Sequence, residues 1–184
     1  MKKFTFENLF AVLFMRKKNS KTLFVGLCFV LLAFLYKSYN TDIKIDDKNF
    51  PDANFRKHLL AQDYGENGII TKEEMEMISE IDVHNCHISN LKGIQYFTNL
   101  KILFCWGNNL NAVRVEELIN YLPDNPTKSF TEYDPGYYRK IYMFSSTSET
   151  EGNFCRKDQV VKLQEKGWNV YYWDGYDWLE YKGN

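Results

Sequence analysis

The chain lacks the short motifs that mark the common enzyme classes. Its 184 residues contain no G-x-S-x-G, no Walker A loop and no H-E-x-x-H helix. A helix start next to Cys155 could lower the pKa of that thiol. However, the three histidines all lie in the amino-terminal half, so none is close to Cys155 in sequence. We interpret Cys155 as structural and expect a protein that is not an enzyme.

The longest uncharged run is also too short to span a membrane. Residues 22–36 (TLFVGLCFVLLAFLY) carry no charge, but as a helix they would reach only about 22 Å of a roughly 30 Å hydrocarbon core. Basic residues precede this run, which is the pattern of an export signal. Translation from Met15 rather than Met1 gives the more compact signal. No small-x-small cleavage site follows Tyr36, so a cleaved signal peptide and an uncleaved anchor both stay open, and in either case the body lies outside the cytoplasm.

The remainder of the chain is mildly acidic and poor in cysteine. Residues 22–184 carry 17 basic and 23 acidic groups, which are the totals of 23 and 24 less the six and one found in residues 1–21. This balance disfavours nucleic-acid binding through phosphate contacts. Cys86, Cys105 and Cys155 are odd in number, so at least one is unpaired in an exported domain, and no disulfide framework is indicated.

A repeat of 22 residues occupies the middle of the chain. The stretch from Ile78 superposes on the stretch from Leu100, and both fit L-x-x-L-x-L-x-x-[NC]-x-L, the signature of a leucine-rich repeat. The central x-L-x is a short strand whose apolar residue faces the core, and the Asn or Cys position, Cys86 or Asn108, lies at the bend that follows. Two copies are too few for a free-standing solenoid, so other elements must close its ends.

The same pattern accounts for HNCH, a sequence that by composition could hold a metal ion. At this bend Cys86 faces inward, whereas His84 and His87 face outward, so the three side chains do not converge. We interpret Cys86 as structural and the two histidines as surface residues.

The flanks predict elements that close the solenoid. Before the repeat, a helix starts at Pro51–Asp52 with Phe55, Leu59 and Leu60 on one face, and a second helix is capped by Thr71 and Glu74. After the repeat, the sequence predicts a helix (115–123), a strand (140–144), a helix (156–166) and a hairpin that turns at Asp174–Gly175.

The expected fold is therefore α/β, with a short leucine-rich-repeat solenoid of about two turns. A single domain covers residues 43–184, and residues 1–42 hold the export signal. Within the domain we expect a helix-loop-helix N-terminal cap (43–77), the repeats (78–114) and an α/β C-terminal cap that ends in a β-hairpin (115–184).

These residues resemble a known family. FPDANFRKHLLAQDYGENGIITKEE and ISNLKGIQYFTNLKILFCWGNNL are similar to the N-terminal cap and first repeats of exported bacterial leucine-rich-repeat proteins of the internalin-like type. GNFCRKDQVVKLQEKGWNVYYWDGYDWLEY resembles their C-terminal cap. The resemblance covers roughly residues 46–184 and implies an exported, cell-surface or periplasmic protein that binds other proteins. Members commonly carry more repeats between the caps than this chain does.

The segment DYGENGIITKEE (63–74) raises a separate question, because it follows the EF-hand pattern except at its third position, Gly65. Its calcium ligands would be Asp63, Asn67, the carbonyl of Ile69, Thr71 and Glu74. With two side-chain charges, binding would be no tighter than the roughly 10⁻⁴ to 10⁻³ M of extracellular modules. The preferred interpretation is a calcium-free loop held by its helix caps; no cofactor is required.

The outward residues of the repeat strands are the predicted partner-binding site: Asp82 and His84 from the first copy, Phe104 and Trp106 from the second. Exposed aromatic residues on a short sheet favour a protein contact. Two alternatives are a weak calcium-binding domain through residues 63–74 and a glycan-binding module. The second would use the closing aromatics, Tyr171, Tyr172, Trp173, Tyr176, Trp178 and Tyr181, although about half of these should pack into the cap.

Overall fold

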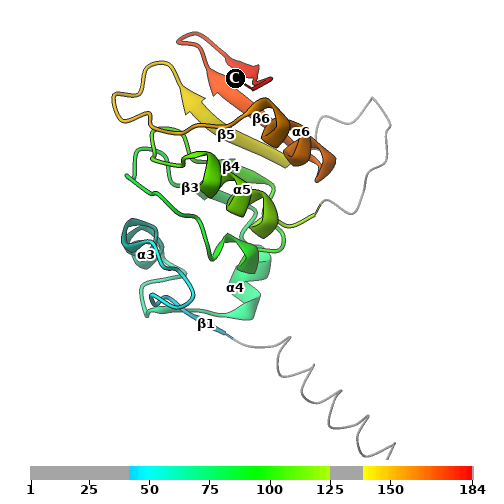
Figure 1. Ribbon diagram of the computed structural model, residues 1–184. Helices are drawn as coiled ribbons and strands as arrows, with labels where there is room; N and C mark the ends of the chain where they lie inside the picture. The colour runs from blue at the N-terminus through cyan, green and yellow to red at the C-terminus, as the bar shows by residue number, and fades with distance from the viewer. Residues whose placement is uncertain (1–41, 125–138, 184) are drawn as a thin grey trace, which may run out of the picture. The chain divides into compact units, whose positions relative to one another are not determined.

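The structure, a computed structural model, describes residues 42–124 and 139–183 (Figure 1). The predicted export signal over 22–36 and the two candidate start residues, Met1 and Met15, lie outside these ranges. No helix within the described ranges is both long enough and apolar enough to cross a membrane.

Short strands and short helices alternate along most of the chain. In order they are β1 (Ile43–Lys44), α3 (Ala53–Leu60), β2 (Ile69–Ile70), α4 (Lys72–Met77), β3 (Glu80–Asp82), the 3-10 turn η1 (Ile94–Tyr96), β4 (Ile102–Phe104), α5 (Ala112–Tyr121), β5 (Arg139–Ser145), α6 (Lys157–Glu165), β6 (Trp168–Trp173) and β7 (Trp178–Glu180). Five strands form one sheet in the order β3-β4-β5-β6-β7, and β1 pairs with β2 separately. The first four strands of the large sheet are parallel and β7 is antiparallel. The fold is thus mixed α/β, as predicted.

The register of the first two strands reproduces the sequence repeat. Ile81 on β3 pairs with Leu103 on β4, residues that lie 22 positions apart, and both are buried. The turn after each strand repeats as well, since Asn85 (φ 51°) and Gly107 (φ 69°) adopt left-handed backbone conformations at the same offset. A Cβ at Gly107 would lie 1.9 Å from Asn85 Oδ1, so the stacked turns leave no room for a side chain there.

The buried side chain of Asn108 is hydrogen-bonded to backbone groups at the ends of β3 and β4. The Asn108 amide nitrogen donates to the carbonyls of Val83 (2.8 Å) and Cys105 (2.9 Å), while its oxygen accepts from the Ile88 N–H (2.8 Å). Cys86 takes the corresponding place in the first copy, where its thiol donates to the His84 carbonyl (3.3 Å). Each bend thereby satisfies carbonyls that the strands leave unpaired.

A third such connection comes from an unexpected place in the sequence. The Asn153 amide donates to the carbonyls of Cys105 (2.7 Å) and Met143 (2.8 Å), and its oxygen accepts from the Leu110 N–H (2.9 Å). These contacts match those of Asn108 one strand further along the sheet. The asparagine ladder therefore continues across β5, which belongs to the predicted C-terminal cap.

The first helix is attached to the repeat by one carboxylate. Asp52 is the N-cap of α3, where its Oδ1 accepts from the backbone N–H groups of Asn54 and Phe55. Its Oδ2 accepts from the Ser89 N–H and hydroxyl and from the Asn90 N–H. Phe55 and Leu59 are buried as predicted. The prediction for Leu60 was wrong: it is 42% exposed, because the residue after Leu59 is rotated by about 100° around the helix.

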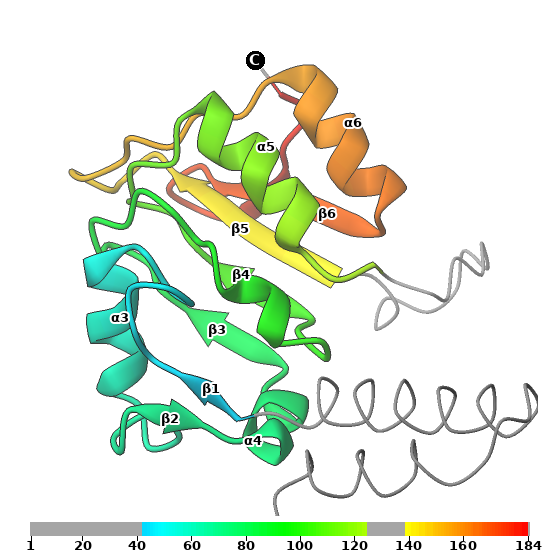
Figure 2. The same cartoon turned by 60° about the horizontal axis from the view of Figure 1, so that its bottom comes forward.

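The later elements match their predicted positions closely. Helix α5 begins three residues earlier than predicted because the Asn111 side chain caps it, accepting from the Arg114 N–H. Gly167 follows α6 with φ +84°, as expected of a helix-ending glycine. Both α5 and α6 cover the same face of the large sheet (Figure 2). The opposite face of the sheet carries the candidate site.

Candidate functional site

A row of outward side chains crosses the whole sheet on the face away from α5 and α6. Strand pairing places Asp82, Phe104, Tyr142, Tyr171 and Glu180 opposite one another, one from each strand. Neighbouring residues along each strand point into the core, as shown by the buried Ile81, Leu103, Ile141 and Val170. We call the five outward residues the central row. It contains two of the four predicted contact residues, Asp82 and Phe104.

The aromatic rings of the central row stack on one another. Phe104 and Tyr142 have ring centroids 4.5 Å apart and are inclined by only 10°, and Tyr142 and Tyr171 follow at 5.3 Å and 29°. These separations are close to the spacing of adjacent strands, about 4.8 Å. The rings therefore stand upright, with their faces against each other. Burial of the Tyr142 ring raises the pKa of its hydroxyl, with smaller contributions from Tyr171 and Glu80.

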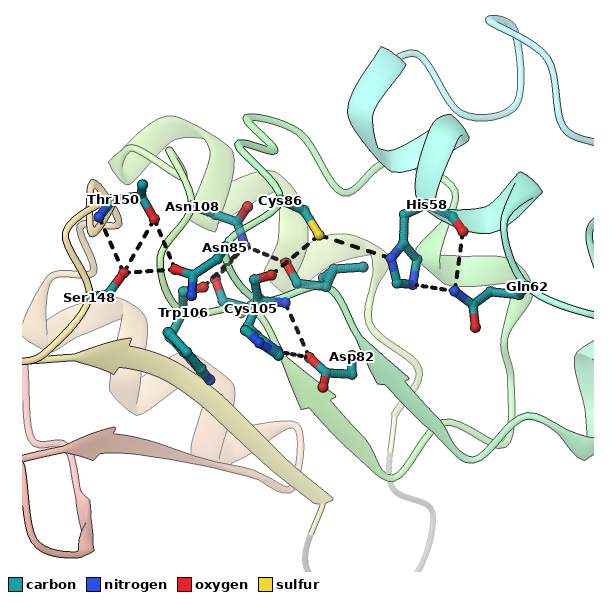
Figure 3. A network of polar contacts seen from close by, with 12 residues as sticks. His58, Gln62, Asp82, Asn85, Cys86, Cys105, Trp106, Asn108, Ser148 and Thr150 are labelled. Atoms are coloured by element: carbon teal, nitrogen blue, oxygen red, sulfur yellow. Dashed lines mark hydrogen bonds and ion pairs between the residues drawn. The ribbon is translucent and has the colours of Figure 1, made fainter.

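The two other predicted contact residues form a stack of their own above the row. The His84 ring lies on the Trp106 ring at 4.4 Å and 14°. Asp82 orients the imidazole, since its Oδ1 is hydrogen-bonded to both the backbone N–H and Nδ1 of His84 (Figure 3). Phe104 and Trp106 thus stack on different partners rather than on each other.

A polar loop supports this end of the face. The Asn85 Oδ1 accepts hydrogen bonds from the hydroxyls of Ser148 and Thr150, both at 2.8 Å (Figure 3). The Glu151 Oε2 accepts from the N–H groups of Gly107 (2.9 Å) and Ser145 (3.0 Å). The loop that follows β5 therefore ties this strand to the turns after β3 and β4.

The closing aromatics divide between the two faces of the sheet, but none of the six is fully buried. Trp178 meets Tyr142 edge-on at 4.7 Å and Trp173 at 5.5 Å, so it extends the outward face. Tyr181 packs instead against Phe144 at 4.4 Å, and its hydroxyl donates to the Cys155 carbonyl. A bulge after Tyr142 turns Phe144 away from the central row. Tyr176, at the tip of the hairpin, is 92% exposed.

The loop over 63–74 uses its oxygens for its own backbone. Asn67 Oδ1 accepts from the Ile69 N–H (2.8 Å), and Glu74 Oε2 accepts from the Thr71 N–H and hydroxyl (both 2.8 Å). The Glu74 N–H in turn donates to Thr71 Oγ1, which completes the predicted capping box. The backbone bond from Thr71 lowers the pKa of Glu74, and the side-chain bond adds to this.

Packing explains why the third position of the EF-hand pattern is a glycine and offers no side-chain ligand. A Cβ at Gly65 would lie 2.0 Å from the Leu59 carbonyl oxygen, so the close contact with the end of α3 requires glycine there. Ile70, by contrast, is fully buried and anchors the loop to the core. Asp63 is exposed. The side chains at 67 and 74 are arranged for hydrogen bonds within the loop, which fits a helix-capping turn better than a calcium site.

The cysteines and histidines of the described ranges lie apart from one another or make other contacts. Within residues 42–124 and 139–183, no group of three or more His, Cys, Asp or Glu side chains is placed to hold an ion. His84 and His87 are exposed, as expected. The half-buried Cys86 thiol lies 4.0 Å from His58 Nδ1 (Figure 3), but burial raises the pKa of the thiol and lowers that of the imidazole. Burial likewise raises the pKa of the Cys155 thiol to about 12, opposite to the effect of an activating helix start.

Comparisons with known proteins identify similar solved structures. Neither a known protein-family pattern nor a curated protein sequence matches the chain. The crystal structure of an internalin (inlF) from Listeria monocytogenes is 20% identical with a TM-score of 0.43; the match covers 71% of this chain and 34% of that one. The functional domain of InlJ from Listeria monocytogenes, which includes a cysteine ladder, is 19% identical with a TM-score of 0.36; the match covers 74% of this chain and 26% of that one. The chain thus spans about a third or less of each of these internalin structures.

Proposed function

We propose that this protein is a non-enzymatic interaction module that binds a partner protein through the outward face of its large sheet. The observation that carries the proposal is the stack of Phe104, Tyr142 and Tyr171, which continues the repeat face into the C-terminal cap. Aromatic residues supply large contact areas at low cost in conformational entropy, and they dominate binding energy at protein interfaces. Because each ring already packs against its neighbour, less side-chain entropy should be lost on binding.

The proposed site is larger than the four residues predicted from the repeats. It comprises Asp82, His84, Phe104 and Trp106 together with Tyr142, Tyr171 and Trp178. The basic residues and apolar run at the start of the chain support a place outside the cytoplasm. The partner would then be a protein met in the periplasm or at the cell surface.

Ring geometry argues against the glycan alternative at Tyr142, the central ring of the stack. A sugar stacks on an uncovered ring face, and both faces of Tyr142 lie against Phe104 and Tyr171. A glycan array with Trp173→Ala and Trp178→Ala controls addresses the remaining hairpin aromatics.

Site-specific photocrosslinking tests the proposal. A benzoylphenylalanine at position 142 should yield a discrete crosslinked protein in the producing cells, because it replaces a ring at the centre of the face. The same probe at position 154 is the matched control, since Phe154 is exposed (45%) but belongs to the segment that leads into α6. Phe104→Ala with Trp106→Ala should abolish the product at 142. Equal products at 142 and 154, or a product that survives the double substitution, would contradict the proposal.

A further inference from the structure

One end of the central row differs in chemistry from the rest. Tyr142 covers one face of the Phe104 ring, and the opposite face points along the row toward β3. The register partner there is Asp82, a short carboxylate whose side chain is 47% exposed. Within the described residues, Tyr142 is the only ring that stacks on Phe104. An aromatic face and a carboxylate thus lie side by side at this end.

The Asp82 carboxylate has one oxygen available to accept a further hydrogen bond. Its Oδ1 accepts both hydrogen bonds from His84. No hydrogen bond to Oδ2 occurs in residues 42–124 and 139–183. A second acid, Glu80, is exposed on the same face of β3, two residues before Asp82, and takes part in no salt bridge among the described residues.

The negative charges of Asp82 and Glu80 affect the pKa values of nearby side chains. Asp82 acts to raise the pKa of His58, although burial, the larger effect, lowers it. Glu80 is among the causes that raise the pKa of Tyr142, two strands away. Two groups that can carry positive charge lie nearby: His84, which is bonded to Asp82 Oδ1, and Lys140, which shares a row with Glu80 but lies two strands from it.

A cation placed at this end would satisfy both neighbours. The π-face of an aromatic ring is negative and attracts cations within about 6 Å of its centroid. A guanidinium group suits the site better than an ammonium, because its planar fork pairs with a carboxylate while its flat surface stacks on a ring. His84 already covers a face of Trp106, which leaves the Phe104 face for an incoming group.

We propose that the site formed by Glu80, Asp82 and Phe104 binds an arginine side chain of the partner. This inference rests on the proposed protein-binding function and adds the chemical identity of one contact. The arginine would stack on Phe104 and donate to Asp82 Oδ2, with Glu80 adding charge. The stacked rings beyond it would contact uncharged parts of the partner.

Defined peptides test this without knowledge of the partner. The probe is a fluorescein-labelled peptide of five Ser-Arg units, and its control has citrulline, which is uncharged and nearly isosteric, in place of arginine. Fluorescence anisotropy with the full chain should show the arginine peptide binding at least about tenfold more tightly than the citrulline peptide. Asp82→Asn should weaken binding of the arginine peptide about tenfold, and Phe104→Leu about threefold.

A matched control distinguishes binding at this site from general attraction between the arginine peptide and an acidic protein. Glu165→Gln makes a comparable charge change at an exposed position on α6, which covers the opposite face. Its affinity for the arginine peptide should equal that of the unmodified chain. Equal losses in Asp82→Asn and Glu165→Gln, or equal binding of arginine and citrulline peptides, would overturn the proposal. If no peptide binds while the crosslink at position 142 persists, the arginine contact is wrong and the protein-binding function stands.

Discussion

At the scale of single residues, the side-chain amide of one buried asparagine pairs with backbone groups that the short strands leave unpaired. Asn108 is almost fully buried and makes hydrogen bonds to Val83, Cys105 and Ile88 at once. A residue of similar size without an amide could fill the space but would leave the Val83 carbonyl and the Ile88 N–H unpaired, while the Cys105 carbonyl would keep its bond from Asn153. Unpaired buried polar groups cost more than the net gain of the bonds themselves.

Replacement of Asn108 by Leu should therefore destabilise the fold by about 3 kcal/mol. Urea unfolding, followed by far-ultraviolet circular dichroism, measures the loss. Asn109→Leu is the matched control: the adjacent side chain is exposed, and its substitution should change stability by less than about 0.5 kcal/mol. Similar losses for the two variants would show that Asn108 does not act through its buried hydrogen bonds.

Residue patterns predicted local contacts well but long-range ones poorly. The inward Ile81 and Leu103 and the Thr71–Glu74 capping box were predicted and are present. The role of Asn153 was not predicted, because it lies 45 positions after Asn108 and breaks the period of 22. The alignment of Tyr142 with Phe104 was missed for the same reason: their pairing depends on where β5 docks, which no local spacing encodes.

At the scale of elements, the loop between α3 and α4 is stabilised by its own hydrogen bonds. Thr71 and Glu74 satisfy each other's backbone groups at the start of α4. Because these bonds lower the pKa of Glu74 in the folded chain, the carboxylate contributes stability above the ordinary glutamate pKa of 4.5. That contribution is lost as the pH falls through the lowered pKa of the folded state.

The substitution Glu74→Gln tests separately the hydrogen bonds of the α4 capping box and the negative charge of Glu74. Glutamine retains an acceptor oxygen but not the negative charge, so at pH 7 the melting temperature should fall modestly below that of the unmodified chain. Between pH 4.5 and more acidic values, the unmodified chain should lose stability faster than the variant. Thermal melts over a pH series give both comparisons.

The same pair of proteins tests for calcium. If Glu74 serves the cap and not an ion, a few millimolar calcium, above the roughly 10⁻³ M of weak extracellular sites, should leave both melting temperatures unchanged relative to chelator. A rise in the unmodified chain that Glu74→Gln abolishes would instead establish a metal site at 63–74.

At the scale of the whole molecule, one hydrophobic core runs from the N-terminal helices to the last strands. Its buried members include Phe55 on α3, Leu103 on β4 and Trp168 on β6. Cys105 and Cys155 lie in this core, and burial raises the pKa of both thiols. A chain with one continuous core should unfold in one step.

Alkylation of the cysteine thiols should show whether the protein unfolds in one step. Iodoacetamide labelling across a urea series, read by mass spectrometry, should modify Cys105 and Cys155 with the same midpoint, because both need global unfolding. Cys86, which is only half-buried, should react at lower urea. If Cys155 were labelled well before Cys105, the C-terminal elements would be a separate folding unit.

The asparagine of the cap has one more consequence. Because Asn153 brings its own amide to the strand ends, its bonds to the preceding repeat are made to backbone groups, the Cys105 carbonyl and the Leu110 N–H, rather than to side chains. An additional block of 22 residues could therefore be inserted between the two ends without redesign of either. The length of the proposed binding face would then grow with the number of blocks inserted.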